Sequence, residues 1–182
     1  MFIPEHFSGY SICLRPARAM SDADLLMRLG LADWLPMEFQ PRRQYMVPIV
    51  VLAEVGHWTV VADGLTYTLS NGSETRQRIA SLAIDVGEVF VGYTADCWDT
   101  FGFSYYREGQ LLRDYLADPE AGQPEHVIKS VGDPLPGETR SLERFSAWEP
   151  LFGVAAALGI SEGVEVTNRR VYHKPPAKPG GP

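Results

Sequence analysis

The chain has 182 residues, a length that favours one domain and can bury a core without a disulfide or a metal. Its 45% hydrophobic and 21% charged residues are ordinary for a globular protein, and no apolar run approaches the ~20 residues of a membrane-spanning helix. The net charge of −7 opposes binding to nucleic-acid phosphates and favours a basic protein partner. We therefore expect neither a nucleic acid nor a membrane as a partner.

The cysteines and the first residues bear on where the protein acts. Cys13 and Cys97 form no CxxC motif and are too few for a disulfide framework. Residues 1–6, MFIPEH, lack the basic and apolar regions of a signal peptide. Together these features predict a cytoplasmic protein.

The first part of the chain predicts a helix among strands. The helix begins at Ser21, whose side chain can cap it, and ends at Gly30, with leucines 25, 26 and 29 on its apolar face. Prolines between Leu31 and Arg43 favour an ordered connection there. The predicted strands are Ser11–Arg15, Tyr45–Val55, Trp58–Val61 and Leu65–Leu69, of which the second is apolar enough to be buried on both faces.

The middle of the chain predicts a helix and then a meander. A capping box at Asn71–Glu74 marks the helix start, and its buried face at helical spacing is Ile79, Leu82, Ala83 and Val86. The strands of the meander are Glu88–Ala95, Thr100–Tyr106 and Leu111–Leu116, with a turn at Arg107–Gln110.

The last part of the chain is less regular. Residues Asp118–Arg144 are rich in Pro, Gly and charge, and predict irregular surface structure. A second capping box at Ser146–Glu149 predicts a helix that ends at Gly159. The alternation of valines 164, 166 and 171 is too weak to assign a strand.

These elements predict an α+β fold with a mainly antiparallel sheet, built of hairpins, on which about three helices pack. We expect a single domain over residues 1–173. Residues 174–182, KPPAKPGGP, have the composition of a disordered Pro/Gly-rich tail.

The sequence lacks the common motifs of catalysis and metal binding. Cys97 lies between Asp96 and Asp99, whose charges disfavour the reactive thiolate. No GxSxG, P-loop, HExxH or EF-hand pattern occurs. The four histidines are far apart in the chain: His6, His57, His126 and His173. We therefore expect no enzyme activity, no metal and no cofactor.

The meander suggests a surface for a partner instead. Phe101, Phe103 and Tyr105 share one strand face and are expected in the core, whereas Trp98, at the hairpin tip, is not required by the core pattern. An exposed Trp between aspartates is typical of an interface anchor with a charged rim, although Trp98 could instead fold back over the sheet edge. The predicted contact residues are Asp96, Trp98, Asp99, Glu108 and Asp114. Two of these acids could alternatively act as a catalytic pair, but solvated loop tips explain them more simply.

Three segments carry a resemblance: FGFSYYREGQLLRDY (101–115), SVGDPLPGE (130–138) and EPLFGVAAALGI (149–160). They resemble a loose group of small bacterial α+β proteins in which a strand and turn precede a Pro-Leu-Pro loop and a final helix. The acidic, β-rich chain without a catalytic motif is also similar to immunity proteins of bacterial toxin systems. The resemblance carries no catalytic residue over, and implies a protein that binds a cognate toxin.

The leading hypothesis is therefore a non-enzymatic, immunity-type protein that binds and neutralises a basic toxin domain. The first alternative is a small-molecule-binding domain or enzyme with a site between the sheet and the helices, using His57, Arg76 or the meander carboxylates. The second alternative is a homodimer or assembly subunit docked through a strand edge.

Overall fold

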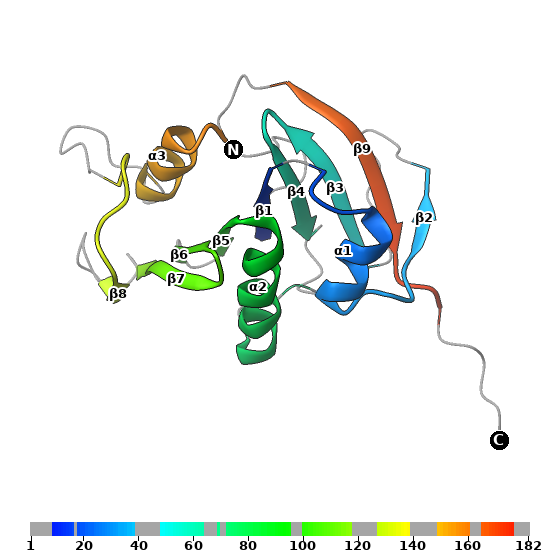
Figure 1. Ribbon diagram of the computed structural model, residues 1–182, viewed down its shortest axis with the longest axis horizontal. Coiled ribbons are helices and arrows are strands. Elements are labelled where there is room, and N and C mark those ends of the chain that lie inside the picture. The colour runs from blue at the N-terminus through cyan, green and yellow to red at the C-terminus, as the bar shows by residue number, and fades with distance from the viewer. Residues whose placement is uncertain are drawn as a thin grey trace.

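The structure is a computed structural model that describes residues 9–16, 18–38, 48–63, 69, 72–95, 100–117, 127–138, 149–160 and 165–176. These residues form three helices and a nine-stranded sheet in which every pair of neighbouring strands is antiparallel (Figure 1). The predicted α+β fold is confirmed. The elements are β1 (Tyr10–Arg15), α1 (Asp22–Leu29), β2 (Leu35–Met37), β3 (Ile49–Val55), β4 (Trp58–Asp63), α2 (Ser73–Val86), β5 (Glu88–Ala95), β6 (Thr100–Arg107), β7 (Gln110–Ala117), β8 (Val127–Val131), α3 (Glu149–Ala157) and β9 (Val166–His173).

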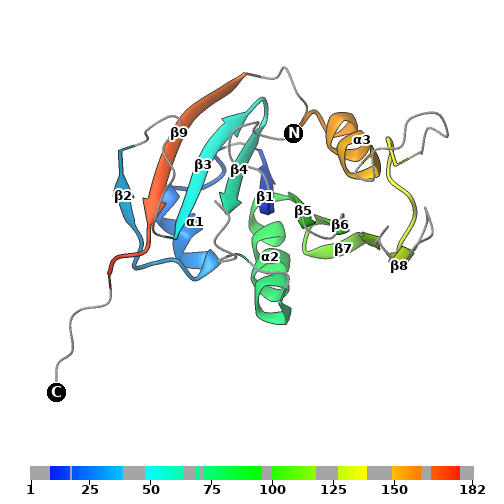
Figure 2. The ribbon, with the colours of Figure 1, turned by 180° about the vertical axis from the view of Figure 1, so that it is seen from behind.

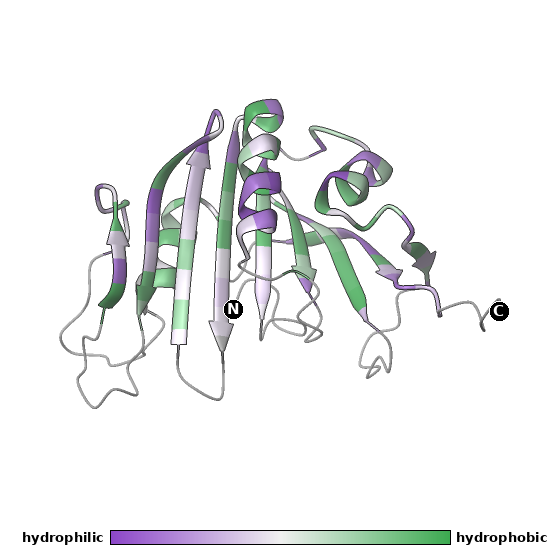
Figure 3. Ribbon diagram, turned by 90° about the horizontal axis from the view of Figure 1, so that it is seen from below, coloured by the Kyte–Doolittle hydropathy of each residue, from purple (hydrophilic) through white to green (hydrophobic). Residues whose placement is uncertain are grey.

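The strand order is β2-β9-β3-β4-β1-β5-β6-β7-β8, so β2 and β8 are the two edges of the described sheet (Figure 3). The β3–β4 hairpin and the β5–β6–β7 meander follow the sequence prediction. Three strands were not predicted. Strand β2 lies in the segment expected to be an ordered connection, and β8 lies in the segment expected to be irregular. The third is β9, which inserts between β2 and β3.

The helices cover the two faces of the sheet unequally. Helices α1 and α2 lie on one face, and from behind β9 and β3 stand in front of α1 (Figure 2). Helix α3 packs on the opposite face, where its Leu151 and Val154 join Phe101 and Phe103 of β6. Each side of the sheet therefore has its own apolar core, and the Phe101–Phe103 face predicted for the core is confirmed.

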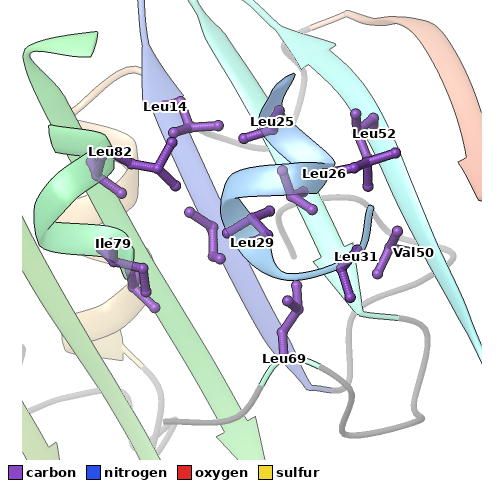
Figure 4. Close-up of a cluster of buried hydrophobic side chains, with 14 of the residues drawn as sticks. Leu14, Leu25, Leu26, Leu29, Leu31, Val50, Leu52, Leu69, Ile79 and Leu82 are labelled. Carbon is purple, nitrogen blue, oxygen red and sulfur yellow. The ribbon is translucent and has the colours of Figure 1, made fainter. Parts of the chain in front are cut away.

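Leucine is the most frequent residue in the core beneath α1 and α2 (Figure 4). Leu25, Leu26 and Leu29 of α1 are buried as predicted, against β3 and β1 residues such as Leu52 and Leu14. Full burial of a side chain of this size contributes about 1.5–3 kcal/mol. The helices show both hydrophilic and hydrophobic bands, because only one side of each faces the sheet (Figure 3).

The caps of the first two helices differ in how well the sequence predicts them. Ser21 caps α1 by accepting a hydrogen bond from the Asp24 N–H, and Gly30 ends it in the left-handed conformation, both as predicted. The predicted capping box of α2 is wrong. Its N-cap is Gly72, which has no side chain to accept a hydrogen bond from the free amides.

Candidate functional site

The predicted contact residues fall in different settings. Asp96, Trp98 and Asp99 lie outside the described residues. Glu108 is exposed in the β6–β7 turn, whereas Asp114 lies within β7 and its side chain is 0% exposed.

The turn that carries Glu108 is closely attached to α2. Glu108 and Gly109 both have positive φ, 51° and 80°, as in a type I′ turn, whose twist matches that of the flanking hairpin strands. The Glu108 N–H donates to the carbonyl of Gly87 at 2.7 Å. A Cβ at Gly109 would lie 2.5 Å from Cγ1 of Ile84, so the end of α2 rests on the turn. The backbone of the turn that carries Glu108 is thus held beside the end of α2.

Asp114 is the centre of a buried ionic cluster. Its Oδ1 accepts from Ser104 Oγ at 3.0 Å, and its Oδ2 accepts from Arg76 Nη1 at 2.8 Å and from Lys129 Nζ. Burial by itself would raise the pKa of Asp114, but the hydrogen bonds from Lys129, Ser104 and Arg76 outweigh it, and the pKa lies below its ordinary value. The prediction that Asp114 contacts a partner is not supported, because both of its oxygens are bound inside the protein.

Exposed apolar side chains gather near Glu108. We define the β7 apolar strip as Ile84, Leu111, Leu112 and Val131, which are 68%, 40%, 37% and 49% exposed. Ile84 contacts the turn at one end, and the carbonyl of Leu112 lies against Gly132, next to Val131, at the other. The sequence pattern places Ile84 in a predicted helix, Leu111 and Leu112 in a predicted strand and Val131 in the segment expected to be irregular. It assigns none of them to a site, because apolar residues in a strand are usually core.

The charges of the described residues are partitioned unevenly. Most of the Lys and Arg side chains are already in ion pairs with carboxylates, namely Arg15, Arg18, Arg28, Arg76, Arg78, Arg107, Arg113, Lys129 and Arg170. Several exposed carboxylates form no ion pair within the described part of the chain, namely Asp24, Asp33, Glu38, Glu108, Asp133 and Glu165. Within the described part of the chain, the surface therefore carries several acids that are not paired with a described Lys or Arg.

One pocket in the described residues was considered as a small-molecule site. A pocket between β1, α1 and β9, partly lined by Arg18, Asp22 and Arg170, has a volume of about 30 Å³. That is room for roughly one water, whereas ligand pockets usually measure roughly 300–1,000 Å³. His57 is exposed in the β3–β4 turn and Arg76 is bound to Asp114, so the residues considered for such a site do not converge.

Cys13 is buried in the sheet, and its burial raises the pKa of the thiol, as expected for a small core residue. No group of three or more His, Cys, Asp and Glu side chains suited to a metal occurs among the described residues. In the same part of the chain, no helix has the length and apolar character needed to cross a membrane.

No known protein family, curated protein or solved structure matches the chain.

Proposed function

We propose that the chain is a non-enzymatic interaction protein of the immunity type, which binds a basic toxin domain in the bacterial cytoplasm and neutralises it. The observation that supports the proposal is the partition of charge. Among the described residues, most cations are engaged in ion pairs, and several exposed carboxylates pair with no described cation and could meet a partner.

This partition has a direct consequence for association. A surface field of one sign raises the rate at which an oppositely charged protein arrives, by ten-fold or more at low ionic strength. Salt screens that attraction, and at roughly 0.1 M ionic strength the screening length is about 10 Å. Binding of a basic partner should therefore show an association rate that falls as salt is added, with a smaller change in the dissociation rate.

The test is co-expression with the product of the neighbouring reading frame, because a gene that protects against a toxin must be inherited with it. We expect the two proteins to co-purify, and the chain to restore growth to cells that make the other product. Surface plasmon resonance over a series of salt concentrations would then give the two rates. If the neighbouring product is neither retained nor counteracted, the proposed function is wrong.

A further inference from the structure

We propose that the β7 apolar strip, Ile84, Leu111, Leu112 and Val131, is where the partner docks an apolar segment flanked by Lys or Arg. This inference rests on the proposed function and specifies which surface performs it. It replaces Asp114 in the predicted contact set with apolar side chains that reach the surface, and it retains Glu108.

Exposed apolar side chains are concentrated at this end of the molecule. Of the large hydrophobic side chains exposed in the described residues, only Met27 and Leu35 lie elsewhere. The others are on the second half of α2 and on β7 and β8, namely Ile84, Leu111, Leu112, Val127, Ile128 and Val131. A contiguous apolar patch with a polar rim marks an interaction site more often than scattered apolar residues do.

The strip is exposed because the helices stop short of it. In the sheet register Leu111 lies opposite Tyr106, and Val131 lies opposite Asp114, which places both on the face covered by α2. The apolar core under α1 and α2 extends as far as Tyr106 of β6 and includes no residue of β7 or β8. A partner that covered this part of the sheet would complete a layer that α2 begins.

The surface is held in one arrangement before any partner arrives. On the same face of the sheet, Asp114 joins β7 to α2 through Arg76 and to β8 through Lys129. On the other face, Arg113 donates to the carbonyls of Val131 at 3.1 Å and Gly132 at 2.9 Å. A preorganised surface loses little conformational entropy on binding, which favours affinity.

Charge selects the occupant. Glu108 lies at the Ile84 end of the strip and Asp133 two residues beyond Val131, and neither forms an ion pair in the described part of the chain. The cations that lie on this face beside the strip, Arg76 and Lys129, are bound to Asp114. A second copy docked by two-fold symmetry would bring equivalent carboxylates into one interface, whereas Lys or Arg of a basic partner would pair with them.

The contact uses side chains more readily than the backbone of the β8 edge. Strand β8 has five residues, its register with β7 shifts next to Ile128, and Lys129 lies at its centre. Short length, a bulge and a lysine are features by which edge strands resist the addition of another strand. We therefore assign the docking to the apolar strip on the face of the sheet.

The experiment measures binding of the purified neighbouring product to two pairs of variants. Ile84→Glu and Val131→Glu place charge in the strip, and Met27→Glu and Leu35→Glu place the same charge on similarly exposed apolar residues elsewhere. We expect the strip variants to weaken binding about ten-fold or more, and the controls to change it less than about three-fold. Circular dichroism and the thermal midpoint of each variant establish that it is folded. Any strip variant that is not folded is replaced by Ile84→Ala or Val131→Ala, which should also weaken binding relative to wild type.

Each outcome bears on a different statement. If wild type binds and the strip variants bind equally well, or if the controls lose as much as they do, the docking site is wrong while the proposed function stands. If wild type does not bind at all, the proposed function fails and this inference fails with it. If light scattering shows a wild-type dimer that the strip variants convert to monomers, the occupant is a second copy and the proposed occupant is wrong.

Discussion

Asp114 Oδ2 accepts a hydrogen bond from Arg76 Nη1 at 2.8 Å, across 38 positions of sequence, where α2 meets the edge of the meander. The two partners differ in their contact with solvent, because the Asp114 side chain is 0% exposed and that of Arg76 is 29% exposed. The anion is therefore the buried member of the cluster, and its two cations reach it from the surface. Loss of the carboxylate and loss of a cation should have unequal effects.

Replacing Asp114 with Asn should lower the free energy of unfolding by about 1–3 kcal/mol, because a charge-assisted acceptor is lost while Arg76 and Lys129 can still be hydrated. Urea denaturation at neutral pH measures the change. The exposed Asp133→Asn is the matched control and should stay within about 0.5 kcal/mol of wild type. Equal effects of the two substitutions would show that the buried cluster contributes no stability.

The same carboxylate predicts a dependence on pH. The pKa of folded Asp114 lies below its ordinary value, so the unfolded chain binds the proton more readily. The stabilisation is fully present above the unfolded pKa of about 3.9 and is lost as the pH falls through the folded pKa. Between about pH 7 and pH 3, wild type should therefore lose more free energy of unfolding than Asp114→Asn, which lacks the titrating carboxyl group at position 114. Urea midpoints at several pH values test this, and parallel curves for the two proteins would contradict it.

The sequence predicted the elements whose local signals agree with their packing. Helix α1 has a cap, a stop and a leucine face, so it was identified nearly to its ends. Strand β3 is a continuous apolar run that ends at Val55 as predicted, although it begins at Ile49 and not at Tyr45. Strand β9 was missed because its pattern is broken. Asn168 has a φ of 49° at a shift in register with β3, and Arg170 faces the helix side to bind Asp22 instead of joining the core.

The candidate site depends on information that a single sequence does not carry. Leu111 and Leu112 have the pattern of a core strand, and only the extent of α2 over the sheet shows that they are exposed. Asp114 differs from the expectation in the opposite direction, because its side chain is buried. An acid in a short meander is most simply placed at the surface, and its burial follows from Arg76 and Lys129, which arrive from elements distant in sequence.

A second buried ion pair should be more costly to break. Arg113 is 2% exposed, and its Nε donates to Glu138 Oε2 at 3.0 Å, which fastens residues 132–138 to β7. Glu138→Ala leaves the buried guanidinium without its anion and should destabilise the fold by about 3–5 kcal/mol. The double variant Arg113→Met with Glu138→Leu should recover part of the loss, because it removes both charges. Thermal and urea unfolding of Arg113→Met, Glu138→Leu and this double variant complete a double-mutant cycle, and additive losses would contradict the coupling.

Two tyrosines provide a matched test of hydrogen bonding. The Tyr10 side chain is buried, and its hydroxyl has no hydrogen-bond partner among the described residues. The Tyr172 hydroxyl donates to Asp22 Oδ2 at 2.7 Å. Tyr172→Phe should therefore cost about 1 kcal/mol, whereas Tyr10→Phe should leave the free energy of unfolding unchanged or raise it by up to about 1 kcal/mol, because a buried polar group without a partner is removed. Urea unfolding followed by tryptophan fluorescence compares the two variants. A loss for Tyr10→Phe as large as that for Tyr172→Phe would mean that the Tyr10 hydroxyl is satisfied in solution, for example by a buried water.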